Sequence, residues 1–369
     1  MLELQLLPAR QGDAIWIRWR DGRAVRQLIV DMGTEGIGRA LRRRLEALPV
    51  RQRVFELLIV THIDADHIGG VLGGVVDAPP LRGLRFHDVW FNGLDHLRPS
   101  RRRRGLEAWG GVQGQRLMTW LAAQPWNRAF GGEPICRDGD TVQSCTLPGG
   151  LMLTVLGPTP RRLAALEPVW QRELQHALAR RREAEPSSGL EAWGRARRTR
   201  PTLRDGAALG RLASQVTGRD ASKANGSSIV LLLEHDGHRI LLGGDAYAED
   251  IVEGLACLGS EPFPLDAFKL PHHGSCENTT RAMIDAIDCP RFLFSTDGTQ
   301  FQHPHAEAVA CVIEHGRRLR RSVELGFNVR SPYNAWWDDA RWKQRFRYRT
   351  RYGGDDGLTL RFPGRRARR

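Results

Sequence analysis

Strand-like and helix-like patterns alternate through the first part of the chain. Residues 1–7, 13–19 and 25–33 alternate apolar and polar positions and predict three β-strands. Leucines spaced for one face of a helix follow over residues 38–48. The segment VFELLIV (54–60) is then apolar at nearly every position, which is typical of a strand buried on both faces. The pattern predicts an α/β arrangement with this last strand inside the protein.

A second ordered block begins near residue 227. The segment SSIVLLLEHDGHRILLGGD (227–245) predicts two apolar strands joined by an Asp-Gly turn. A short strand that ends at His272 and another over RFLFSTDG (291–298) are expected downstream. Helices are expected between and after these strands, at about 248–258, 277–287 and 304–319.

The regions outside these two blocks are less regular. Residues 80–135 mix a strand, a basic loop and a short helix, and residues 159–222 begin with a helical stripe and continue as a polar, basic excursion. A basic and aromatic extension covers about 330–369 and contains one more strand, LTLRF. We interpret residues 1–369 as a single domain, with insertions at about 80–135 and 159–222 and this C-terminal extension.

The composition is that of a soluble globular protein, with 41% hydrophobic and 26% charged residues. The N-terminus lacks the charged and apolar regions of a signal peptide, and no apolar run approaches the roughly 20 residues that cross a membrane. The six cysteines form no CxxC pair. We therefore expect a cytoplasmic protein that does not enter a membrane.

The net charge of +13 favours a polyanionic partner such as nucleic acid. Nearly all of this charge is arginine, however, and genome composition also produces such a bias. The arginine groups that could follow a phosphate backbone lie at 101–104, 180–182, 195–204, 317–321 and 341–351. Aromatic residues interleave with the last group and suit either base stacking or packing on the core; they are Trp336, Trp337, Trp342, Phe346, Tyr348 and Tyr352.

Histidine and aspartate residues are concentrated where the apolar run 54–60 ends, in the stretch THIDADHIGG. His62, Asp64, Asp66 and His67 fall within six positions there. Keeping four such side chains at the end of a buried strand is costly unless something binds them. Imidazole and carboxylate are both common metal ligands. The cluster therefore predicts a metal site.

Three further strands end at residues of the same kinds: Asp31, then Asp245, then the pair His272 and His273. Taken singly, each has an ordinary alternative. Asp31 suits a turn, Asp245 suits a helix N-cap, and the histidines suit simple packing. Taken together, they offer ligands from several rigid strand ends, which is what a metal site requires.

These motifs, HxDxDH followed by GD and then PHHGS, together resemble the metallo-β-lactamase superfamily. The most similar branch is the one typified by the soluble domain of the DNA-uptake protein ComEC. The resemblance covers about 1–75 and 225–310 and leaves out the insertions and the C-terminal extension. It rests on QGDAIWI (11–17), LIVDMG (28–33), THIDADHIGG (61–70), NGSSIVLLLEHDGHRILLGGDA (225–246), KLPHHGS (269–275) and HPH (303–305).

The resemblance implies a four-layer αββα sandwich with a pair of metal ions at the edge of its two sheets. His62 and Asp64 would then hold the first ion, and Asp66 and His67 the second. Asp245 would bridge both ions and would take part in catalysis together with Asp66.

Other roles also follow from the resemblance. His272 would complete the second site, although either member of the pair suits this place, and His273 would serve as an acid or contact the substrate. Asp31 would support the ligand loop from behind. The family often has a further histidine before the GD motif, and Asn225 lies near that place. His303 would line the site as a proton donor, or alternatively would start a helix.

The aspartate at position 64 bears on the choice of metal. A carboxylate in place of an imidazole makes the first site harder, which favours Mn²⁺ or Mg²⁺ relative to Zn²⁺. We expect two divalent ions, with Mn²⁺ favoured and Zn²⁺ or Mg²⁺ as alternatives.

The leading hypothesis is a metal-dependent phosphodiesterase or nuclease that acts on DNA, with single strands favoured, through a metal-bridged hydroxide. Hydrolysis of a lactone, thioester or cyclic nucleotide is a second hypothesis, because a fold does not determine its substrate. A third is a regulatory or binding component of a bacterial multi-protein system, with protein partners bound by the insertions. The sequence leaves the oligomeric state open.

Overall fold

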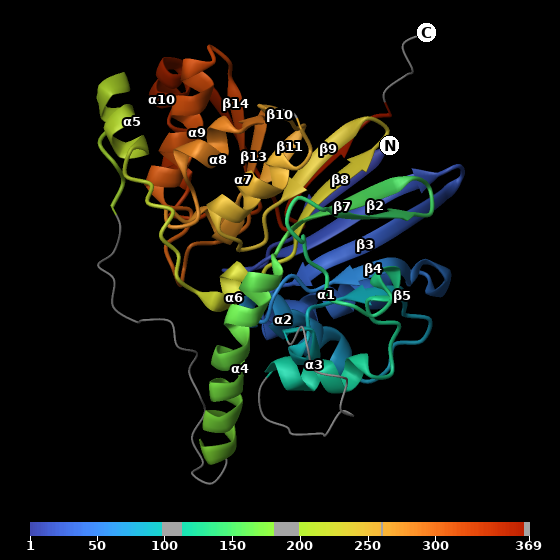
Figure 1. Cartoon of the computed structure of the whole chain (residues 1–369). Coiled ribbons are helices and arrows are strands. Elements are labelled where there is room, and N and C mark those ends of the chain that lie inside the picture. The colour runs from blue at the N-terminus through green and yellow to red at the C-terminus, as the bar shows by residue number, and fades with distance from the viewer. Residues whose placement is uncertain (98–112, 181–198, 260, 365–369) are drawn as a thin grey trace.

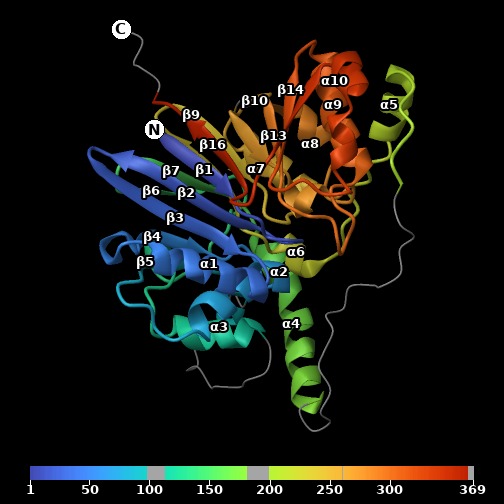
Figure 2. The ribbon, with the colours of Figure 1, turned by 180° about the vertical axis from the view of Figure 1, so that it is seen from behind.

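The structure, a computed structural model, describes residues 1–97, 113–180, 199–259 and 261–364. Two β-sheets lie face to face, and helices cover the outer face of each (Figures 1 and 2). The four-layer αββα sandwich that the resemblance implies is therefore confirmed. In the described ranges, no helix has both the length and the apolar character needed to cross a bilayer.

The first sheet has six strands. In spatial order they are β16 (Leu358–Phe362), β1 (Leu2–Leu6), β2 (Ala14–Asp21), β3 (Ala24–Met32), β4 (Val54–Ile59) and β5 (Arg85–Trp90). The pairs from β16 to β3 are antiparallel, and β3, β4 and β5 are parallel. The helices α1 (Glu35–Ala47), α2 (Ala65–Val71), α3 (Gln113–Leu121) and α4 (Pro160–Arg180) belong to its outer side.

The second sheet has eight strands. In spatial order they are β15 (Tyr348–Tyr352), β14 (Val323–Phe327), β13 (Arg291–Phe294), β11 (Ala267–Lys269), β9 (His238–Leu242), β8 (Val230–His235), β7 (Leu151–Gly157) and β6 (Gln143–Leu147). The helices packed on its outer side are α5 (Gly206–Ala213), α7 (Ala248–Ala256), α8 (Arg281–Asp285), α9 (Ala306–Arg318) and α10 (Ala340–Phe346). A short pair, β10 (Phe263–Pro264) and β12 (Ile287–Asp288), lies apart, and the short helix α6 (Lys223–Gly226) precedes β8.

The position of strand β4 between two cores explains why its sequence is apolar. Leu57 and Ile59 face the core between the two sheets, whereas Leu58 faces the core under the first-sheet helices. Because successive side chains on a strand point to opposite faces, a strand covered on both sides needs apolar residues at nearly every position. The predicted burial of this strand is confirmed.

The C-terminal extension is built into both sheets. Strand β16 pairs antiparallel with β1, and β15 pairs parallel with β14. The interleaved aromatics mostly lie in the second-sheet core, where Trp337, Trp342, Phe346 and Tyr348 are buried. These four rings are therefore closed to stacking bases, and packing on the core is the alternative that holds for them.

Some strands differ from the prediction; β14 and β15, for example, were not predicted from the sequence. The strand expected to end at His272 ends at Lys269, because Pro271 follows and His272 and His273 both have positive φ, at 46° and 55°. Strand β6 was not predicted from the sequence, since as an edge strand it carries half-buried and exposed residues rather than an apolar face. The arginines at 101–104 and most of those at 180–182 and 195–204 lie outside the described residues.

Helices α1 and α2 meet at glycines, which gives a test of this packing. A Cβ atom on Gly38 would lie 2.0 Å from the backbone oxygen of Gly70, whereas a Cβ on Gly36 of the same helix would meet nothing within 4 Å. We expect Gly38→Ala to lower the free energy of unfolding by about 1–3 kcal/mol, because the helices must separate. Gly36→Ala should instead raise it by up to about 1 kcal/mol. Denaturant unfolding measures both, and equal effects would contradict the close approach.

Candidate metal centre

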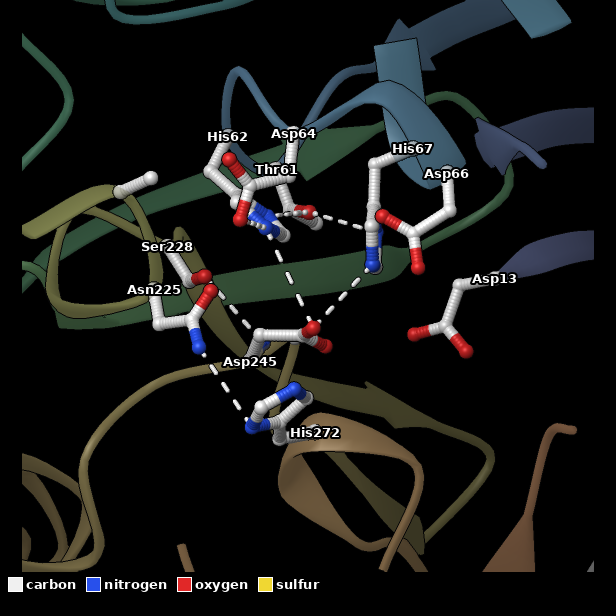
Figure 3. Close-up of polar contacts among 12 residues, drawn as sticks. Asp13, Thr61, His62, Asp64, Asp66, His67, Asn225, Ser228, Asp245 and His272 are labelled. Atoms are coloured by element: carbon white, nitrogen blue, oxygen red, sulfur yellow. Dashed lines mark hydrogen bonds and ion pairs between the residues drawn. The ribbon is translucent and has the colours of Figure 1, made fainter. Parts of the chain in front are cut away.

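The candidate ligands converge at one edge of the sandwich, where strands from both sheets end (Figure 3). Strand β4 leads into Thr61 and His62, and Asp64 is the N-cap of α2, which carries Asp66 and His67. Strand β9 leads into Asp245, and β11 leads into His272 and His273. Parallel strands place their carboxyl ends at the same edge, so ligands far apart in sequence become neighbours.

Four buried residues form the tightest group. Asp13, His67, Asp245 and His273 each offer a ligand atom, and these atoms all lie within 4.8 Å of one another. The Nε2 atoms of His67 and His273 each lie 3.3 Å from Oδ2 of Asp245, and Nε2 of His62 lies 4.0 Å from the same oxygen. Three imidazoles therefore surround one carboxylate, which suits Asp245 for a shared ligand.

The two remaining aspartates of the HxDxDH motif lie on either side of this carboxylate. Oδ2 of Asp64 lies 3.4 Å from Nε2 of His62, and Oδ2 of Asp66 lies 3.6 Å from Nε2 of His273. Figure 3 shows His62 with Asp64 on one side and His67 with Asp66 on the other, with Asp245 between them. The arrangement has two lobes, each with imidazole and carboxylate donors.

The donor atoms fit a divalent cation. Nε2 of His62, His67 and His273 and Oδ1 of Asp245 are all buried, and none makes a hydrogen bond within the described part of the chain. A buried polar atom without a partner costs about 1–3 kcal/mol, so several at one place call for a ligand. Imidazole nitrogen and carboxylate oxygen are the donors that Zn²⁺ and Mn²⁺ accept.

Burial and charge act against each other on the pKa values of the cluster. Burial disfavours ionisation of Asp245, but the imidazoles of His273 and His67 hold its pKa well below the usual range. Burial likewise disfavours charged imidazoles, but the carboxylates of Asp245 and Asp31 raise the pKa of His67 well above its ordinary value. The pKa of His273 is raised in the same way, by Asp245 and Asp13. Asp245 is therefore ionised at neutral pH, as a metal ligand must be.

Asp31 orients the ligand loop. It is the last residue but one of β3 and has a positive φ of 53°, and its carboxylate accepts hydrogen bonds from the Thr61 backbone N–H at 2.9 Å and the Thr61 hydroxyl at 2.7 Å. The same carboxylate lies 2.8 Å from Nδ1 of His67. When the ring is neutral, as a metal ligand must be, an N–H at Nδ1 that donates to Asp31 leaves a lone pair on Nε2, which faces Asp245.

We expect Asp31→Asn to weaken metal binding by about 10–100-fold, because the amide cannot both hold Thr61 and accept from His67. The matched control is Asp21→Asn, which removes a carboxylate paired with Arg26 at the far end of strand β2. Titration against a chelating dye measures the affinity, and thermal unfolding checks the fold. Equal affinities for the two variants would contradict this role for Asp31.

The structure separates the two neighbouring histidines. His273, rather than His272, faces Asp66 and Asp245. Nδ1 of His272 lies 2.7 Å from Oδ1 of Asn278, and the Asn278 amide group donates to the Asp245 backbone oxygen at 3.1 Å. That orientation makes the Asn278 oxygen an acceptor, so His272 carries its proton on Nδ1 and keeps a lone pair on Nε2.

Asn225 lies beside His272 rather than beside His62 and Asp64, the two residues expected to hold the first ion. Its amide group donates to Asp220 at 2.7 Å and lies 3.4 Å from Nδ1 of His272 (Figure 3). Asp220 also accepts from Asn278 at 2.7 Å. Asn225 is thus part of a hydrogen-bonded group that surrounds the His272 ring.

His303 is buried against the two histidines. Its ring centroid lies 5.0 Å from that of His272 and 6.1 Å from that of His273. Burial, together with the neighbouring imidazoles of His305 and His272, holds the pKa of His303 well below its ordinary value, so the ring is neutral at pH 7. The helix that follows is capped by His305, not by His303.

Asp13 and Lys269 are among the residues at the site that were not predicted. Asp13 precedes β2, and because β2 is antiparallel to β3, the start of β2 lies beside the end of β3. Lys269 ends β11 and forms an ion pair with Asp13. A signal existed in each case: Asp13 belongs to the QGD motif of the resemblance, and Lys269 is one of only three lysines in the chain.

The sequence profile of the metallo-beta-lactamase superfamily matches residues 7–144, the segment that contains Asp13, Asp31 and the HxDxDH motif. The profile describes the whole superfamily and does not single out the ComEC-like branch. No curated protein sequence matches the chain.

Two solved structures are similar at low identity. The metallo-beta-lactamase fold protein YhfI from Bacillus subtilis has 11% identity and a TM-score of 0.43, over 97% of this chain and 98% of that one. A mutant of CmlA beta-hydroxylase has 12% identity and a TM-score of 0.37, over 98% of this chain and 53% of that one.

Proposed function

Because residues 7–144 match the profile of the metallo-beta-lactamase superfamily, we propose that the chain is a dinuclear metal-dependent phosphodiesterase that acts on nucleic acid, with single-stranded DNA favoured. The observation that carries the proposal is the two-lobed donor set around Asp245, in which each lobe has a carboxylate of its own, Asp64 or Asp66. Carboxylate donors favour hard cations such as Mn²⁺ and Mg²⁺, and these cations bind phosphate oxygens readily.

The donors divide into two sets. Asp66, His67 and His273 would hold the second ion, and His62 and Asp64 would hold the first, with Asp245 shared between them. The first site is short of a protein ligand in this set. Nε2 of His272 is the candidate for that place, since the hydrogen bond to Asn278 leaves it with a lone pair and the ring lies next to Asp245 (Figure 3).

Divalent ions bound there would lower the pKa of a water molecule and neutralise charge on the phosphate and the leaving oxygen. The protein's part is to fix the donors. Asp31 orients His67, and Asn278 orients His272. Asp64 and Asp66 are the most exposed donors, at 33% and 18%, so substrate would approach from their side. His303, neutral and buried behind the two histidines, would line the site rather than supply a proton.

Charge supports nucleic acid as the substrate class. The chain carries +13, whereas the candidate site is acidic, so phosphate would be held by cations at the site and by arginines outside it. Several of the predicted arginines already have acidic partners, among them Arg317, Arg318 and Arg321. Arg349 and Arg351 of β15 are exposed.

The test is incubation of the metal-loaded protein with labelled single-stranded DNA, double-stranded DNA and RNA, beside an Asp66→Asn variant. We expect cleavage of single-stranded DNA by the wild type, and a loss of about 100-fold or more in the variant, because Asp66 would be a direct ligand. Binding should also weaken steeply with added salt. Cleavage of none of these polymers, alongside turnover of a lactone or thioester, would favour the small-molecule alternative.

A further inference from the structure

A lysine lies completely buried beside the candidate metal centre. The side chain of Lys269 has no exposed surface, and its Nζ pairs with Asp13. Nζ also donates to the backbone oxygen of Gly244 at 3.0 Å and lies 3.9 Å from Oδ1 of Asp245. Burying an ammonium group costs several kcal/mol unless its partners are well placed. The buried ammonium group of Lys269 is therefore expected to have a role within the site.

Asp13 uses its two carboxylate oxygens differently. Oδ2 pairs with Lys269, whereas Oδ1 lies 3.4 Å from Nδ1 of His273, and neither of these two atoms makes a hydrogen bond within the described residues. The other ring nitrogen of His273, Nε2, faces Asp245 and Asp66. Asp13 therefore approaches His273 at the ring nitrogen that does not face those two carboxylates, although it also lies within 4.8 Å of the ligand atoms of His67 and Asp245.

This arrangement parallels the one at His67. There Asp31 lies at Nδ1, 2.8 Å away, and Nε2 faces Asp245. A carboxylate behind a ligating histidine fixes the ring and keeps the proton on the nitrogen that does not bind metal. Both histidines of the second lobe thus have such a carboxylate, but only that of His273 is tied to a buried lysine.

We propose that Asp13 is a positioning residue for His273, and that Lys269 holds Asp13 in that role. Asp13 then accepts the proton of Nδ1 and leaves Nε2 free for the second ion. Lys269 pairs with Oδ2 of Asp13, and this ion pair keeps the Asp13 carboxylate from turning towards the metal ion and binding it directly. The inference rests on the proposed function, since His273 needs this tautomer only if it binds a metal.

The experiment uses Asp13→Asn, which keeps the shape of the side chain. With Lys269 present, the amide oxygen should face the ammonium group, and the amide NH₂ should face Nδ1 of His273. That orientation moves the imidazole proton to Nε2, where it blocks metal binding. We expect the affinity for the second Mn²⁺ ion to fall by about 10–100-fold. Adding Lys269→Met should restore part of this affinity, because the amide can then turn its oxygen to His273.

Calorimetric titration with Mn²⁺ measures both sites in the wild type, Asp13→Asn and the double variant, and thermal unfolding follows the fold. A purely structural ion pair would change the unfolding temperature and leave the affinity of folded Asp13→Asn unchanged, which would overturn the inference. Should the double variant not fold, the single variant still decides between these outcomes. A wild type that binds no ion would instead defeat the proposed function, so the two failures are distinguishable.

Discussion

Asp245→Asn is expected to remove metal binding from both lobes at once. Its carboxylate faces the Nε2 atoms of His62, His67 and His273, so no other residue of the group is placed to be shared in this way. The asparagine keeps the shape but loses the charge and one good donor. We expect the affinity for both ions to fall by more than about 100-fold, beyond the range for residues that act only behind a ligand. Hydrolytic activity should fall at least as far.

The control for Asp245→Asn is Asp250→Asn, which also removes a buried carboxylate, but one on the outer helix α7 that pairs with Arg162 of α4. Asp250→Asn should alter stability and leave the number of bound ions unchanged. Metal content by elemental analysis and Mn²⁺ titration give the measurement. If Asp245→Asn still binds two ions tightly, the bridging assignment is wrong.

Removing metal with a chelator should abolish hydrolysis, and Mn²⁺ should restore it better than Mg²⁺ or Zn²⁺. The reason is Asp64, which gives the first lobe a carboxylate where an imidazole would favour zinc. Replacing this residue, Asp64→His, should shift the preference towards Zn²⁺ by about tenfold relative to Mn²⁺. Activity of the stripped protein across the three ions, with ion content measured in parallel, tests both statements.

A matched control for Asp64→His is Asp77→His. The two aspartates are similarly exposed, at 33% and 37%, but Asp77 pairs with Arg116 and lies outside the two lobes. Asp77→His should keep the metal profile of the wild type. A wild type that works with Zn²⁺ alone, or an Asp64→His variant with an unchanged profile, would refute the hard-metal interpretation.

Much of the fold could be predicted because its signals are local. The alternation over residues 1–33, the continuous apolar run of β4 and the Asp-Gly hairpin between β8 and β9 each determine an element through a short-range pattern. The edge strand β6 and the burial of the aromatic extension were less accessible. An edge strand needs no apolar face, and an interleaved aromatic and basic pattern suits core and surface alike.

The candidate site likewise has one part that the local sequence determines and another that depends on the tertiary structure. The HxDxDH cluster is contiguous, so the sequence by itself placed His62, Asp64, Asp66 and His67 together at the end of a buried strand. Only the tertiary structure shows that His273, and not His272, faces Asp66 and Asp245, because positive φ angles at both residues end the strand and send the two rings in different directions. It also brought Asp13 to Lys269 and His273, from strands of different sheets. Sequence periodicity carries no information about such a contact, because a buried ion pair depends on where two chain segments meet in space.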